Sequence, residues 1–131
     1  MDAEAYRATM ADLLRRKIPS VVKEVVTAAI DKKAEKTVVI NLKGVTEMTD
    51  FIVICHGQSS RQNRAIADEI QHRLREKFRR KAFGVEGKNS TDWILLDYVD
   101  FVVHVFSQEN RSKFSLEKLW MDGKRYDFFR D

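Results

Sequence analysis

The sequence has 131 residues, of which 44% are hydrophobic and 34% charged, with a formal net charge of +4. This length suits one domain that closes a hydrophobic core without disulfides or structural metals. No apolar run approaches the ~20 residues of a membrane-spanning helix, and the single cysteine, Cys55, has no partner for a disulfide within the chain.

The amino-terminal residues do not resemble a targeting segment. They lack a basic stretch followed by an apolar one, and they contain Asp2, Glu4 and Asp12, whereas organelle-targeting peptides avoid acidic residues. We therefore expect a cytoplasmic protein. The sequence pI near 9.3 permits contact with nucleic acid without requiring it.

Two helices are expected before the first strand. Over residues 3–17, Tyr6, Met10 and Leu13 recur at helical spacing, so we interpret residues 1–18 as an N-terminal helical extension. Pro19 and Ser20 favour the start of a second helix, which we expect to run to about residue 36. Its apolar pairs recur every four residues and predict a buried stripe; they are Val21/Val22, Val25/Val26 and Ala29/Ile30.

Residues 37–42 and 50–55 are strand candidates, because both runs are rich in β-branched residues. A long helix follows, and Ser59 with Gln62 three residues later predicts a capping box at its start. The expected inner face of this helix consists of Ile66, Ile70, Leu74 and Phe78.

The end of this long helix is strongly basic. Its cations are Arg73, Arg75, Lys77, Arg79, Arg80 and Lys81. Cations at a helix carboxyl terminus complement the helix dipole, which favours a solvated helix end. Binding of RNA phosphate stays open as the alternative, although no aromatic residues are interleaved for base stacking.

Residues 92–106 predict a β-hairpin. Both arms are dense in β-branched, aromatic and leucine residues, and Asp97 and Asp100 mark the turn between them. The arms are apolar on both faces, so we expect helices to cover both. Together with the preceding elements and a short final helix, the pattern predicts a single α/β domain with a mixed central sheet flanked by helices. In the final helix, Leu116, Leu119 and Trp120 are expected to point inward.

Several motifs in this half of the chain occur together in one known family. They are Gly84-Val85-Glu86-Gly87, Asp92-Trp93-Ile94-Leu95-Leu96-Asp97-Tyr98, Val103-His104-Val105-Phe106, Glu109-x-Arg111 and Leu116-Glu117-Lys118-Leu119-Trp120. With the upstream runs at residues 49–54 and 57–61, they resemble the ribosomal silencing factor family, also called Iojap-like. Val99 stands where that family usually has glycine, which leaves the turn type open because valine disfavours positive φ.

The resemblance implies an Iojap-like domain over residues 19–121, with a nucleotidyltransferase-like topology. The remaining segment, 122–131, is a C-terminal tail that either folds back onto the domain or stays mobile. The resemblance further implies a translational repressor without a cofactor. Such a protein binds the large ribosomal subunit through its universal L-type protein fourteen and sterically blocks joining of the small subunit. A peripheral contact with ribosomal RNA and a homodimer both stay open.

The alternative is a nucleotide-binding or nucleotidyltransferase-like enzyme. Gly57-Gln58-Ser59, between a strand and a helix, is similar to the phosphate-binding start of such enzymes. Those enzymes also need two carboxylates at i and i+2 on a following strand to hold magnesium. Asp97 and Asp100 are instead three residues apart across a turn, so we expect no catalytic residues and no enzyme activity.

We expect no metal site among the histidines and the cysteine. Cys55 and His56 are neighbours on a strand and point to opposite sides of the sheet. His104 shares a strand face with Phe106, which favours a hydrogen-bonded structural histidine.

The candidate partner-binding residues lie around the hairpin. Trp93 and Tyr98 are possible aromatic anchors, because aromatic side chains dominate protein interfaces. Trp120 and Phe106 are assigned to the core instead. This end is locally negative within a basic protein because of Glu86, Asp92, Asp97 and Asp100, which suits a basic protein partner better than RNA.

Overall fold

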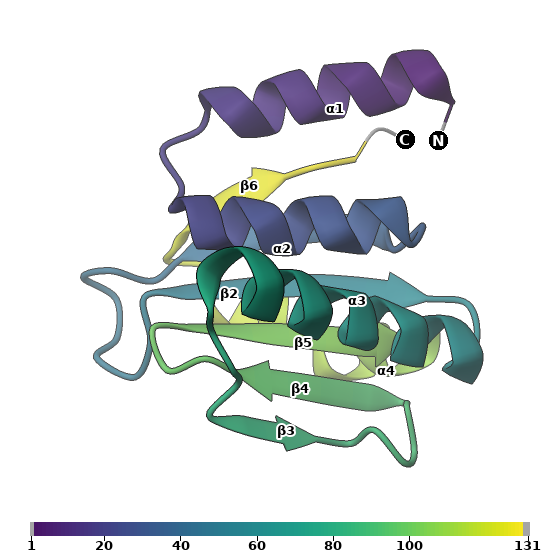
Figure 1. The fold of residues 1–131 in the computed structure, drawn as a ribbon. Coiled ribbons are helices and arrows are strands. Elements are labelled where there is room, and N and C mark those ends of the chain that lie inside the picture. The colour runs from purple at the N-terminus through teal and green to yellow at the C-terminus, as the bar shows by residue number, and fades with distance from the viewer. Residues whose placement is uncertain (1, 130–131) are drawn as a thin grey trace.

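The computed structural model describes residues 2–129 as helices packed on both faces of one sheet (Figure 1). The helices are α1 (Ala3–Arg15), α2 (Ser20–Asp31), α3 (Ser60–Phe78), α4 (Gln108–Phe114) and α5 (Leu116–Leu119). The strands are β1 (Glu35–Asn41), β2 (Phe51–Gly57), β3 (Gly84–Glu86), β4 (Trp93–Asp97), β5 (Phe101–Ser107) and β6 (Lys124–Asp127). Among the residues described, no helix is long and apolar enough to cross a membrane.

The six strands form a mixed sheet in the order β3-β4-β5-β2-β1-β6. β2 and β5 run parallel at its centre, and the other neighbouring strands pair antiparallel. The predicted α/β class with a mixed central sheet is therefore confirmed. The predicted hairpin is confirmed as well, because β4 and β5 pair antiparallel across a turn at residues 98–100.

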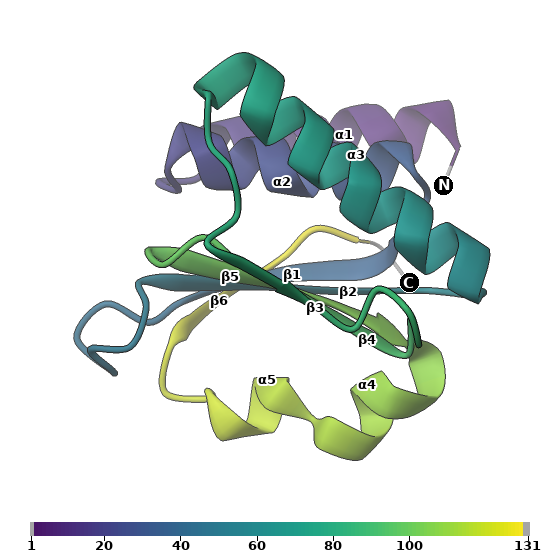
Figure 2. The same cartoon turned by 60° about the horizontal axis from the view of Figure 1, so that its bottom comes forward.

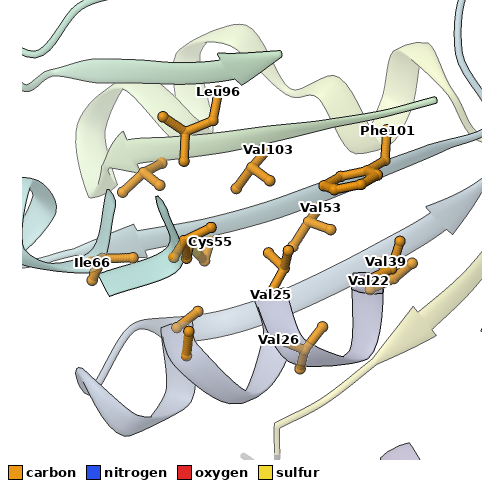
Figure 3. Packing of buried hydrophobic residues seen from close by; sticks show 14 of the residues in the cluster. Val22, Val25, Val26, Val39, Val53, Cys55, Ile66, Leu96, Phe101 and Val103 are labelled. Carbon is orange, nitrogen blue, oxygen red and sulfur yellow. The ribbon is translucent and has the colours of Figure 1, made fainter. Parts of the chain in front are cut away.

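Figure 2 shows the helices as two unequal layers, with α1, α2 and α3 on one side of the sheet and α4 and α5 on the other. Side chains alternate between the faces of a strand, so each strand contributes to both sides. On the side of α2 and α3 most of the sheet is covered, as Figure 3 shows for Val25, Val53 and Leu96, each of which is fully buried. We call this side the closed face.

The two expected amphipathic helices take the predicted orientation towards the closed face. From α3, Ile66, Ile70 and Leu74 are fully buried there, and the valines of α2 pack beside them. The predicted length of α2 was wrong, because it ends at Asp31 rather than near residue 36. Lys33 then adopts φ 63°, which turns the chain into β1.

The tail predicted over residues 122–131 folds back onto the domain within the described chain. Its residues 124–127 form β6, which pairs antiparallel with β1 at the edge of the sheet. Tyr126 and Phe128 are buried in the core. In contrast, the prediction that Leu119 points inward was wrong, since its side chain is 66% exposed; Leu116 is buried as predicted.

Candidate partner-binding face

The side of the sheet opposite the closed face is only partly covered. α4 and α5 bury Ile52, Ile54 and Phe106 in a second, smaller core. Towards β3 and β4 this cover stops, and Trp93, Leu95, Asp97 and Val102 are only half-buried. The expectation that helices cover both faces of the hairpin therefore holds on this side for His104 and Phe106 of β5, which are buried, and was wrong for β4. We call Glu86, Trp93, Leu95, Asp97 and Val102 the open face.

Strand register brings these five residues together. Trp93, Leu95 and Asp97 alternate along β4 and so share one side of it. On β5, Val102 lies opposite Asp97, and on β3 the exposed Glu86 lies opposite Leu95. Three of the predicted partner-binding residues, Glu86, Trp93 and Asp97, thus project from the same surface.

Trp93 is held firmly in place on this surface. Its indole N–H donates a hydrogen bond to Nδ1 of His104 at 3.0 Å. Its ring lies 4.9 Å from the Phe106 ring and 4.7 Å from the Phe114 ring, measured between centroids. Because Phe114 is 44% exposed, the pair presents an aromatic surface whose position the fold has already fixed.

His104 has the structural role predicted for it. The side chain is buried, and this burial lowers its pKa to about 4, so the imidazole is neutral at pH 7. A neutral ring with the proton on Nε2 accepts the Trp93 hydrogen bond at Nδ1. His104 therefore orients Trp93.

Tyr98 does not belong to the open face. Its ring stacks on Phe101 with 4.9 Å between centroids, and only 2% of the residue is exposed. Burial raises the pKa of its hydroxyl. The prediction of Tyr98 as a partner anchor is corrected accordingly: it is a core residue beneath the turn, because the turn folds its ring over the first side chain of β5.

Asp100 is on the surface but already has a partner within the chain. Its Oδ1 and Oδ2 accept hydrogen bonds from the Arg80 guanidinium at 2.6 and 3.2 Å. The Arg80 hydrogen bonds lower the pKa of Asp100. Arg80 also lies over the Phe101 ring, 5.3 Å from its centroid. Asp100 thus joins the hairpin turn to the segment after α3.

Part of the basic end of α3 is used in the same way. Arg73 pairs with Glu24, Asp31 and Glu69, and Lys77 pairs with Glu24. These pairs connect α3 to α2, so both side chains have a structural role. Arg75, Arg79 and Lys81 remain exposed at this end of the helix.

The start of α3, where the enzyme alternative would place a phosphate, lines a groove of about 750 Å³. The predicted capping box is confirmed in its first half, because Ser59 Oγ accepts the Gln62 N–H at 3.1 Å. Its second half differs, because Gln62 Oε1 accepts the N–H of Gln58, one residue before the N-cap, at 2.7 Å. Two of the amide donors that could bind an anion are thus used within the chain. Asp92 and Glu109 also line the groove, and their negative charge repels an anion.

Two other side chains that could react, Cys55 and His56, are buried. Cys55 is fully buried, and burial raises the pKa of its thiol to about 12, which keeps it protonated and unreactive. His56 lies between Glu35 and Arg111, at 3.1 Å from each. Within residues 2–129, no three His, Cys, Asp or Glu side chains are grouped as ligands for a metal ion.

Leu95, Val102 and Phe114 were not among the predicted site residues. For Leu95 the signal was present in the sequence, since it alternates with Trp93 and Asp97 along one strand. Val102 and Phe114 join the surface only through strand pairing and through the position of α4. Neither of these follows from local periodicity.

Comparison with known proteins gives a consistent result. Residues 15–130 match the RsfS family, described as ribosomal silencing factor during starvation. The ribosomal silencing factor RsfS of Halalkalibacterium halodurans is 43% identical over 100 residues, which span 74% of this chain and 82% of that protein. A mouse protein named mitochondrial assembly of ribosomal large subunit protein 1 is 31% identical over 91 residues, 68% of this chain and 40% of its own length.

The fold is similar to a solved structure as well. A crystal structure of a Chromobacterium violaceum protein superimposes with a TM-score of 0.76 at 29% sequence identity, covering 81% of this chain and 88% of that one. The matched family spans nearly all of the sheet and both helical layers. The chain belongs to the ribosomal silencing factor family.

Proposed function

We propose that this protein represses translation by docking on the large ribosomal subunit through the universal L-type protein fourteen, which keeps the small subunit from joining. Membership of a family of ribosomal silencing factors supports the repressor role. The name of the mouse relative associates that protein with the large subunit and supports this subunit as the partner. The observation that carries the proposal is the open face.

The open face, together with Phe114 of α4 beside it, has the composition of an interface. The half-buried Trp93 and half-exposed Phe114 provide rigid aromatic area, so little side-chain entropy is lost when a partner covers them. Leu95 and Val102 extend the apolar centre, and the carboxylates of Glu86 and Asp97 lie at its edge. This combination fits a basic protein with an apolar anchor, and a standard interface needs about 800 Å² from each partner.

The mechanism we propose is steric exclusion. No bond is made or broken, and the protein acts by occupying a surface that the small subunit needs. The groove at the start of α3 favours this mechanism over nucleotide chemistry, because Gln62 and Ser59 occupy amide donors there and two carboxylates line it. The large-subunit side is the expected site of action.

A subunit-joining experiment tests this function. The protein is added to purified large subunits before or after the small subunits, and the joined fraction is read from sedimentation profiles. We expect joining to fall, with saturation at one protein per large subunit and without nucleotide. Ribosomes that are already joined should resist. Binding mainly to small subunits, or full occupancy of large subunits with unchanged joining, would contradict the proposal.

A pair of variants connects this activity to the open face. Phe114→Ser removes an exposed aromatic ring of the surface, and Leu14→Ser removes a 73% exposed leucine from α1 on the other side of the sheet. Leu14→Ser leaves the buried core intact, whereas Phe114 also stacks near the buried Phe106, so thermal unfolding of both variants checks that the fold is kept. We expect the first to weaken repression of joining at least tenfold, and the second to leave it unchanged.

A further inference from the structure

Next to the open face, the loop of residues 43–50 lies against the hairpin turn of residues 98–100. The Thr49 hydroxyl donates to the Val99 carbonyl at 3.0 Å, and the Asp50 amide donates to the Asp100 carbonyl at 2.9 Å. Three apolar side chains are exposed on these two segments: Val45 by 39%, Met48 by 80% and Val99 by 60%. We call Val45, Met48 and Val99 the turn patch.

Val99 has an unfavourable backbone conformation for its side chain. Its φ is 75°, and the Asp100 amide donates to the Tyr98 carbonyl at 3.0 Å, which defines a γ-turn centred on Val99. A β-branched residue at positive φ clashes with its own backbone, whereas glycine does not. Among the described residues, the other non-glycine residues with positive φ are polar or charged: Lys33, Lys36, Arg79, Thr91 and Ser115.

The valine side chain contributes little to the core in return for this strain. It is mostly exposed to solvent, and the hydrogen bonds of the turn involve its backbone. The Val99 amide donates to Oδ1 of Asp97 at 2.8 Å, and its carbonyl accepts from Thr49. A glycine would keep each of these bonds. Strain that the fold does not need is typical of functional positions.

We propose that the turn patch is a second contact for the protein that binds the open face, with Val99 at its centre. The proposal rests on the function proposed above and extends the docking surface along β4. Asp97 connects the two regions, because its side chain lies on the open face and also accepts the Val99 amide. A partner that covers Trp93 and Asp97 therefore reaches the turn.

The charges around the turn patch define the part of the partner that it receives. Glu47 and Asp50 are exposed on the loop, and Asp97 is half-buried beside the turn. Arg80 neutralises Asp100, and the one cation of the loop is Lys43, which lies over the Phe51 ring, 5.6 Å from its centroid, and keeps its positive charge. Glu47, Asp50 and Asp97 outnumber this cation. The remaining charge is negative, so the turn patch fits a basic segment that carries an apolar side chain.

Two substitutions at position 99 separate stability from binding. Val99→Gly relieves the strain, and the melting temperature should rise by about 3 °C. The same change removes the exposed side chain, so affinity for purified large subunits should fall five- to tenfold. Asparagine tolerates positive φ and carries a polar side chain. Val99→Asn should therefore show the same loss of affinity as Val99→Gly, with a turn that is less mobile than that of the glycine variant. Leu14→Ser is the matched surface control and should bind like wild type.

The readouts are thermal unfolding and a co-sedimentation titration against large subunits. If wild type binds large subunits and both position-99 variants bind them with the same affinity as wild type, the turn patch is not a contact and the inference is overturned. It is also overturned if Val99→Gly lowers the melting temperature, since the higher entropy of the unfolded glycine chain would then not be offset by relief of strain. Failure of wild type to bind large subunits would instead overturn the proposed function, and the turn patch with it.

Discussion

The two faces of the hairpin differ in what covers them. Ile94 and Leu96 project from β4 onto the closed face and are fully buried, whereas their neighbours Trp93 and Leu95 project from the other side and are half-buried. The hairpin is thus anchored from one side by α3 and the strands around it. This arrangement leaves the opposite side available for a partner, and it implies that stability and binding depend on alternate residues of one strand.

The strongest test of this difference is a pair of neighbouring leucines. Leu96→Ala removes a fully buried side chain and should lower the free energy of unfolding by about 4 kcal/mol, since a cavity remains. Leu95→Ala on the open face should cost less than about 1.5 kcal/mol. Urea denaturation measures both values. Equal costs would mean that the open face is packed as tightly as the closed one.

The next effect concerns pH and His104, which lies under Trp93. Burial gives the folded protein a His104 pKa of about 4, below the ordinary value of 6.5. Between these values the unfolded chain binds the proton and the folded chain does not. The contribution of neutral His104 to the free energy of unfolding is therefore fully present above pH 6.5. It is lost as the pH drops towards 4, by up to about 3 kcal/mol. His56, whose pKa is also lowered by burial, adds in the same direction.

Comparison with His104→Gln isolates this contribution. Unfolding free energies of both proteins are measured at intervals from pH 7 to pH 4, and the difference between their slopes belongs to His104. The variant should lose less stability over this range, while His56 and the carboxylates keep their effect in both proteins. Parallel curves would show that His104 is protonated as easily in the fold as in the unfolded chain.

The smallest expected effect is at the turn. Asp100→Asn breaks the ion pair with Arg80, but the Asp100 side chain is 49% exposed and solvent screens the pair. The loss of stability should be below about 1 kcal/mol and should shrink in high salt. Denaturation at low and high ionic strength measures it. A larger loss that does not depend on salt would point to packing of Arg80 over Phe101 as the main contribution.

The sequence predicted the elements whose periodicity is long and regular. The hairpin followed from its apolar arms and from Asp97 and Asp100 between them. The inner face of α3 followed from helical spacing. In contrast, β6 could not be assigned, because a short charged strand is held mainly by backbone hydrogen bonds to β1, and such bonds leave no side-chain pattern.

The candidate site was predictable in part for a similar reason. Trp93 and Asp97 share a face through simple alternation, but Glu86 joins them only through the register of β3 with β4. Tyr98 was misplaced because a γ-turn centred on a valine is not expected from sequence, and this turn lets the tyrosine ring stack on Phe101. Incomplete cover by α4 and α5 depends on where two short helices end, which local patterns do not determine.

We propose that the open face, and not the sheet edge in general, binds the large ribosomal subunit. The most direct measurement compares the affinities of Leu95→Glu and Val85→Glu for purified large subunits. Both positions are partly exposed near the β3 edge, with Leu95 on the open face and Val85 on the opposite side. We predict that Leu95→Glu weakens binding at least tenfold and that Val85→Glu binds like wild type. Equal affinities for the two variants would show that the open face is not the surface that binds the large subunit.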